Sequence, residues 1–301
     1  MAHLHQDHVG ILLRVLSGFF FATMIVTVKL VSVAVPLGEI VFFRSAIALV
    51  PLVAFLWLRQ DFPSGLRSQR PWLHVARSVF GAMATFTSFA AITRLSAAEA
   101  TLLSYIAPVL LAVIAVALLG ERLTIYRAGG LLLGLAGVFV LVWPELSSIY
   151  LQDQIGEEQR LIGMALGVTT AILTALSLIV TRILTRTDSV GGIAFWFAVA
   201  TAGAGLGTLH FGWVIPDPKT FALLAAAGIL GGCAHIAMTL AFRFAQATRL
   251  APFEYIALIW LVLADLMIFG QSLSTAFFVA LPLVLGGAVI AAVERTRKLP
   301  G

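Results

Sequence analysis

Five ionisable residues lie inside long apolar segments of this 301-residue chain: Lys29, Arg44, Arg77, Glu254 and Asp265. A charged side chain surrounded by lipid is costly, so such residues are expected to face a cavity or a partner and to bind a solute or an ion. At 1.5 Å per residue, Arg77 and Glu254 lie roughly 8–9 Å inside one end of their segments. We expect them to form an inner charge pair, or to line a cavity separately and approach each other in one state of a cycle. Contact with lipid headgroups is the structural alternative for Arg77, whereas the shorter Glu254 favours a functional role.

The other three ionisable residues lie within about seven residues of the opposite ends of their segments. Asp265 is flanked by apolar residues and could neutralise Lys29 or Arg44, which would leave the other cation to attract an anionic or carboxylate-bearing ligand. The alternative is a static ion pair and one base that reaches the headgroups. Because burial favours the protonated form of a carboxylate, Glu254 or Asp265 would also suit proton coupling.

The segments themselves require lipid as the solvent. Hydrophobic residues make up 60% of the chain and charged residues 11%, and the mean hydropathy is +1.04. Soluble domains average roughly 25% charged residues. Turn and charge signals divide the chain into ten segments of about 20 residues, the length of a membrane-spanning helix. They run approximately over 9–31, 37–58, 72–94, 97–119, 124–143, 160–184, 191–211, 219–243, 249–270 and 274–293. The sequence therefore predicts an all-α polytopic membrane protein.

The chain repeats itself at an offset of 150 residues. The aligned stretches are 104–107 with 254–257, 119–123 with 269–273, and Gly137 with Gly287, and weaker similarity pairs 40–43 with 193–196. This predicts two domains, residues 1–150 and 151–301, with five spans each. Because five is an odd number, the second domain enters the membrane from the opposite side. Such inverted repeats are used by many secondary transporters, whose substrate site lies between the halves near the midplane.

Three uncharged candidates are polar groups inside the spans. Tyr105 and Tyr255 occupy equivalent repeat positions, and their hydroxyls could orient a substrate in a cavity wall or serve helix packing alone. His235 lies near the middle of its span. No second histidine stands at a metal-ligand spacing, so we expect neither a metal nor another cofactor, and we favour a hydrogen-bonded core histidine over a proton relay.

The run from Ala97 to Pro108 and the turn Leu119-Gly120-Glu121-Arg122-Leu123 that ends the fourth span resemble the EamA type of the drug/metabolite transporter superfamily. The resemblance extends over nearly the whole chain, although Gln271-Ser272 replace the acid and base in the second copy. It implies ten helices around a central cavity and the export or uptake of small metabolites, amino acids or related compounds.

Lys and Arg residues are distributed unequally between the two sides of the membrane, which predicts the orientation. Arg94, Arg160 and Lys219 alone lie on one side. The other side, which includes both ends of the chain, carries Arg14, Arg59, Arg67, Arg70, Arg77, Arg122, Arg127, Arg182, Arg186, Arg243, Arg249, Arg295, Arg297 and Lys298. We therefore expect a multi-pass protein of the plasma membrane, the inner membrane in a bacterium, with both termini cytoplasmic. The net charge of +5 then reflects orientation and not a nucleic-acid partner.

These observations favour a secondary-active or facilitative transporter that works by alternating access. An intramembrane enzyme acting on a lipid or small molecule would need a nucleophile with a base, paired carboxylates or a metal cluster, and the sequence contains no GxSxG, GxGD or HExxH motif. A channel would show a ring of repeated polar residues along one path. The substrate, the direction of transport, proton coupling and a homodimer are left open.

Overall fold

The computed structural model describes residues 2–32, 34–92, 94, 103–149, 157–269 and 275–292, and all regular structure within these ranges is helical. The first half contains α1 (Ala2–Val31), α2 (Leu37–Leu58), α3 (Pro71–Ile92), α5 (Ala107–Leu119) and α6 (Ile125–Ile149). The second half contains α7 (Glu157–Leu184), α8 (Val190–Leu206), α9 (Pro218–Phe244), α10 (Ala247–Leu250), α11 (Ile256–Phe269) and α12 (Thr275–Ala292). Short 3₁₀ turns are η1 (Ser64–Leu66), η2 (Leu209–Phe211) and η3 (Ala251–Tyr255).

The helices confirm the prediction of an all-α polytopic membrane protein. In the described ranges, seven helical stretches are long and apolar enough to cross a bilayer, and the apolar helices α5 and α8 are shorter. Large apolar side chains such as Val50, Leu132 and Met267 are exposed on the outside of the bundle, where lipid and not water must solvate them. α1 begins at Ala2, seven residues before its predicted span, and α6 ends at Ile149, six residues after its own. α5 begins at Ala107, and residues 97–102 of its predicted span lie outside the described part.

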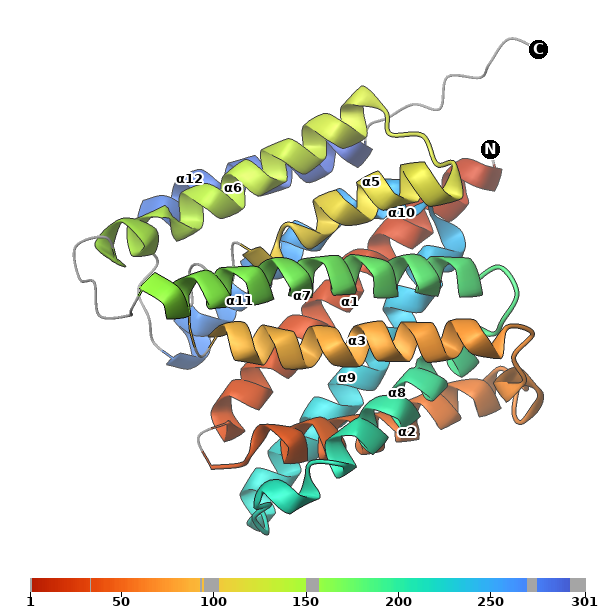
Figure 1. Ribbon diagram of the computed structural model, residues 1–301. Helices are drawn as coiled ribbons and strands as arrows, with labels where there is room; N and C mark the ends of the chain where they lie inside the picture. The colour runs from red at the N-terminus through yellow and green to blue at the C-terminus, as the bar shows by residue number, and fades with distance from the viewer. Residues whose placement is uncertain are drawn as a thin grey trace.

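Helices from the two halves pack against each other in pairs (Figure 1). α6 lies along α12 at one edge of the bundle, α3 lies along α7, and α2 lies along α8 at the other edge. α1 crosses α9 in the same way. The beginning of α1 and the end of α12 lie at one end of the bundle, here called the inner end, and the connection between α1 and α2 lies at the opposite, outer end.

Glycines permit the close approach of these pairs. Gly130 of α6 packs on the backbone of Gly287 of α12 with no room for a Cβ, and a Cβ at Gly137 would lie 3.0 Å from the Ala280 carbonyl oxygen. The 150-residue repeat makes the two contacts equivalent. Position 130 corresponds to 280 and position 287 to 137, so the Gly130–Gly287 contact corresponds to the Ala280–Gly137 contact. Small residues at such crossings let helix backbones meet in a membrane, where packing drives association.

Local signals in the sequence explain where several helices begin and end. α5 ends at Gly120, whose φ of 63° is the left-handed conformation that a glycine adopts at low cost. Asp217 begins α9 as its N-cap, accepting a 2.9 Å hydrogen bond from the Lys219 backbone N–H, and Ser189 does the same for α8 through Gly192. These ends fix which residues of each helix reach the centre of the bundle.

Candidate functional site

The centre of the bundle contains irregular backbone at corresponding places in the two halves. In the second half, α10 and α11 are joined by the 3₁₀ turn η3, which carries Glu254 and Tyr255. In the first half, a turn at Tyr105 precedes α5, so Pro108 lies at the start of that helix and not inside one. Non-helical backbone is tolerated at membrane depth where it is buried in protein or lines a cavity. Paired breaks of this kind mark the substrate site in many transporters.

The two tyrosines meet at these breaks. Their ring centroids are 5.7 Å apart, and the Tyr255 hydroxyl donates a 3.4 Å hydrogen bond to the Tyr105 backbone carbonyl. Tyr255 is fully buried and its ring packs on Gly134, where no Cβ would fit. The structure thus brings together two residues that the repeat aligns but that are 150 positions apart.

Glu254 is paired with Arg14 of α1, whose Nη2 lies 2.9 Å from Glu254 Oε1. Both side chains are about one tenth exposed, at 10% and 11%. Within the described residues, Arg14 Nε and Glu254 Oε1 make no hydrogen bond of good geometry, so the contact is one of charge. The pair joins the first half of the chain to the second.

This pairing corrects the predicted charge pair of Arg77 and Glu254, which does not form in this structure. η3 lies against α1, whereas α3 packs on α7 and α8, so the two residues face different neighbours. The alternative, that they line a cavity separately and approach in another state, remains a prediction. Sequence reasoning missed Arg14 because it assigned this residue to the membrane boundary, whereas α1 begins at Ala2 and Arg14 is its thirteenth residue.

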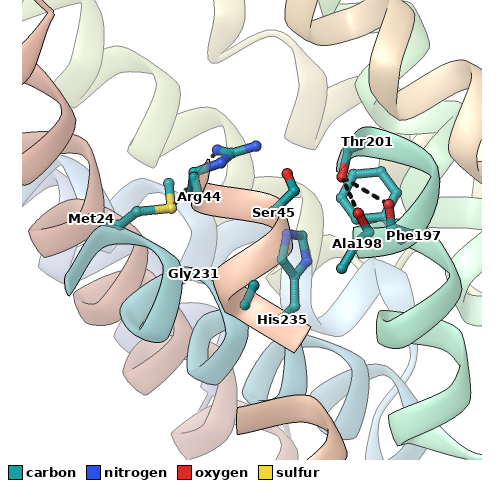
Figure 2. A pocket seen from close by; sticks show the side chains of 9 residues that line it. Met24, Arg44, Ser45, Phe197, Ala198, Thr201, Gly231 and His235 are labelled. Atoms are coloured by element: carbon teal, nitrogen blue, oxygen red, sulfur yellow. Dashed lines mark hydrogen bonds between the residues drawn. The ribbon is translucent and has the colours of Figure 1, made fainter. Parts of the chain in front are cut away.

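Arg44 and His235 line one cavity, shown in Figure 2. Its walls come from α1, α2, α8 and α9, and the lining residues are Met24, Arg44, Ser45, Ala48, Phe197, Ala198, Thr201, Gly231 and His235. In this state the cavity has room for about one water molecule. Arg44 Nη1 lies 3.8 Å from the sulfur of Met24. In addition to His235, the cavity is lined by three polar side chains, those of Arg44, Ser45 and Thr201.

His235 contacts two aromatic rings. Its imidazole lies 5.0 Å from the Phe197 ring and 5.1 Å from the Phe21 ring, measured between centroids, with edge-to-face geometry. Its Nδ1 is buried and has no hydrogen-bond partner among the described residues. The expectation of a hydrogen-bonded core histidine remains a prediction, because no contact of the second ring nitrogen is described. Across the described ranges, no three metal-ligating side chains gather at one place.

Arg77 is turned into the bundle and lies over the ring of Phe197. Its guanidinium carbon lies 4.1 Å from the centre of the Phe197 ring, and its Nε donates a 2.7 Å hydrogen bond to Thr181 Oγ1. The residue is 2% exposed, which excludes in this structure the alternative that it reaches lipid headgroups. Its Nη1 is buried without a hydrogen-bond partner in the described part of the chain.

One predicted site residue is not brought into this arrangement, and the side chain of another lies outside the described part of the structure. Lys29 lies in the last turn of α1, where it is exposed. Asp265 lies on α11, but its side chain falls outside the described residues. Whether Asp265 neutralises Lys29 or Arg44 therefore remains a prediction.

A buried acid of the first half caps a helix of the second half at the inner end. Glu121, in the turn after α5, accepts hydrogen bonds from the backbone N–H groups of Ala247 and Thr248, at 3.2 and 2.9 Å, and from Thr248 Oγ1 at 3.0 Å. Arg182 of α7 lies 3.4 Å from the same carboxylate. A carboxylate at a helix N-terminus satisfies N–H groups that the helix leaves unpaired.

Neighbouring arginines extend this set of contacts, which we call the inner network. Arg127 donates to Gln246 at 2.7 Å and to Thr248 at 2.8 Å, and Arg249 pairs with Asp7 at 2.8 Å. The network joins α1, α6, α7 and the α5–α6 turn to α10 and its N-cap at the inner end. The sequence offered only the Gly-Glu-Arg turn as a signal, because the partners lie 61 to 242 residues apart.

Two other buried acids accept hydrogen bonds from segments that connect the helices. Asp188, between α7 and α8, accepts a 2.5 Å hydrogen bond from Ser68 and lies 2.7 Å from His74 Nε2. Burial acts to raise the pKa of Asp188, but the hydrogen bonds from Ser68, His74 and neighbouring groups outweigh it and hold that pKa below its usual value. At the outer end, Glu39 accepts a 2.9 Å hydrogen bond from the Val214 backbone.

Comparison with known proteins gives one family and several transporters. Residues 8–143 match the EamA-like transporter family. The pseudopaline exporter CntI of Pseudomonas aeruginosa is 29% identical over 252 residues, which cover 83% of this chain and 84% of that protein. The riboflavin transporter of Rhizobium johnstonii is 26% identical over 93% of this chain and 90% of its own length. The S-adenosylmethionine uptake transporter of Rickettsia prowazekii is 27% identical over 77% and 75%.

A solved crystal structure shares the fold, with a TM-score of 0.82 at 24% sequence identity and coverage of 96% of this chain and 99% of that one. The relatives are named as transporters and not as enzymes. The match over residues 8–143 and the transporter-named relatives support a small-metabolite transporter of the drug/metabolite transporter superfamily.

Proposed function

We propose that the protein moves a carboxylate-bearing metabolite across the membrane by alternating access. The observation that carries this proposal is the cavity between α2 of the first half and α8 and α9 of the second, where Arg44 lies beside His235 and two hydroxyl groups. A guanidinium recognises a carboxylate through paired hydrogen bonds. Relatives named for pseudopaline, riboflavin and S-adenosylmethionine support a small organic solute and leave its identity open.

The moving parts in this proposal are two inverted repeats, residues 1–150 and 151–301. The exchanged glycine contacts of α6 and α12 support a two-fold relation, and so do the tyrosines that meet at equivalent breaks. In this scheme the inner network holds the inner end closed, and it must separate for the cavity to open on that side. The many Lys and Arg residues at the inner end support a cytoplasmic location for it and for both termini, in a plasma membrane.

Glu254 is the proposed proton-coupling residue. Its carboxylate is nearly buried, its charge partner Arg14 comes from the other half, and it lies at the helix break beside both tyrosines. Protonation would release Arg14 and loosen the contact between α1 and η3. Coupling would then show as substrate accumulation driven by a pH gradient, which Glu254→Gln should abolish while downhill exchange continues.

The function can be tested by a thermal-shift screen of metabolites on the purified protein, since a bound ligand stabilises the folded state. Compounds that raise the melting temperature would then be assayed for concentrative uptake into proteoliposomes, which separates a transporter from a channel. We expect carboxylates among the ligands and expect them to be lost in Arg44→Gln but kept in Arg243→Gln, a control at an exposed position of α9. Carboxylate binding that is unchanged in Arg44→Gln would contradict the proposal.

A further inference from the structure

Two arginines lie close to Phe197 without an acid to balance them among the described residues. Arg44 lines the cavity together with Phe197 and His235, and Arg77 lies over the Phe197 ring, and neither arginine forms an ion pair within the described part of the chain. The buried acids that the structure describes are engaged elsewhere. Glu254 holds Arg14, Glu121 holds Arg182 and Asp188 holds His74, and Glu39 accepts a hydrogen bond from the Val214 backbone.

Both guanidinium groups have more N–H donors than the described residues engage. A guanidinium offers five N–H donors. Arg77 uses Nε on Thr181 and places its flat face over Phe197, which leaves Nη1 buried and unpaired. Arg44 contacts only a methionine sulfur, a weak acceptor. Leaving a charge unpaired in a membrane is costly, and such residues mark the path of a substrate or an ion.

The two arginines enter the bundle from opposite ends. Arg44 is the eighth residue of α2, which begins at the outer end, and Arg77 is the seventh residue of α3, which begins at the inner end. At 1.5 Å per residue each backbone position lies roughly 10 Å inside a hydrocarbon layer about 30 Å thick. Their positions are therefore separated by about 10 Å along the membrane normal, a gap that two long side chains can narrow from both sides.

From this arrangement we propose that the cavity recognises a substrate with two separate anionic groups, such as a dicarboxylate, with one group on Arg44 and the other on Arg77. The proposal rests on the proposed transport function and names the substrate class of the same site. Phe197 and His235 would lie along the part of the substrate between its charged ends. Because the cavity now holds about one water molecule, binding also requires the helices around it to separate.

The test compares dicarboxylates with monocarboxylates of equal carbon number on the full-length protein in detergent. The probes are succinate against butyrate and adipate against hexanoate, and thermal shift over a concentration series gives each affinity. We expect the wild type to bind at least one dicarboxylate tenfold or more tightly than its matched monocarboxylate. Arg44→Gln and Arg77→Gln should each bring the two affinities together, whereas the exposed control Arg243→Gln should keep the preference.

Two further measurements make the outcome decisive. Each Gln variant without ligand should melt at a higher temperature than the wild type, because the substitution removes an unbalanced buried charge. Arg77→Lys and Arg44→Lys, which keep the charge, should retain part of the dicarboxylate preference. Equal affinities for matched probes in the wild type, or a preference that survives both Gln substitutions, would overturn the inference. If both probe classes bind and both need Arg44 alone, the carboxylate function stands and only the second anionic group is refuted.

Discussion

Removing the Glu121 side chain should destabilise the protein more than any other single change at its inner end. In Glu121→Ala, the backbone N–H groups of Ala247 and Thr248 lose their acceptor, and Arg182 loses its carboxylate partner. The carboxylate is 3% exposed, so water cannot readily replace it. Because Glu121 and α10 belong to different halves, the loss also weakens the closed inner end.

The magnitude follows from the contacts that are lost. Hydrogen bonds to a charged group contribute about 1.5–3 kcal/mol each, but bonds that share one carboxylate are not additive. Breaking a buried ion pair by removing one partner costs about 3–5 kcal/mol. We therefore expect Glu121→Ala to lower the free energy of unfolding by about 3–5 kcal/mol, while Glu121→Gln, which keeps one acceptor oxygen, should cost about half as much.

The assay is equilibrium unfolding in mixed micelles, followed by circular dichroism for the wild type and the variants. Glu158→Ala provides the matched control, because Glu158 is exposed at the beginning of α7 and should change stability by no more than about 0.5 kcal/mol. A loss below about 1 kcal/mol in Glu121→Ala would refute the reasoning. It would mean that the N–H groups of α10 find other acceptors and that the inner network does not hold the halves together.

Three other substitutions test separate parts of the structure. Gly137→Leu should cost about 2 kcal/mol or more in unfolding experiments, because even a Cβ would lie 3.0 Å from the Ala280 carbonyl, and a variant as stable as the wild type would contradict the packing of α6 on α12. Tyr255→Phe should cost only about 0.5–1 kcal/mol, because it removes one 3.4 Å hydrogen bond and leaves the ring in place; a much larger loss would point to an unseen partner. The lowered pKa of Asp188 means that its ionised form stabilises the folded state above the usual value of 3.8, a contribution lost as the pH falls through the lower folded value. Asp188→Asn should therefore flatten the decline in melting temperature on the acid side, and an unchanged slope would refute this role.

The sequence predicted the helices well because lipid imposes a simple rule on them. Every span must be long and apolar, so the ends of α2, α7 and α9 lie within a few residues of the predicted boundaries. The repeat also singled out Tyr105 and Tyr255 as equivalent positions, although it did not show that they touch. Periodicity and composition describe a helix and its solvent, and they do not identify its neighbours.

The side-chain partners could not be predicted for the same reason. The charge pair predicted for Arg77 and Glu254 matched depth and sign, but depth alone does not say which helices pack together. Arg14 lies 240 positions from Glu254, and Glu121 lies 127 from Thr248. These contacts follow from packing across the two halves, which neither half encodes by itself.

Thiol accessibility of a residue inside the cavity tests alternating access most directly. Ser45, a buried lining residue, would be changed to cysteine in a Cys233→Ser background, and a membrane-impermeant thiol reagent would be applied to each side of oriented proteoliposomes. Val113→Cys, on the exposed face of α5, is the control that lipid should protect from both sides. We predict that the cysteine at position 45 reacts from either side. Reaction from one side only, or from neither, would contradict a cavity that opens alternately to the two sides of the membrane.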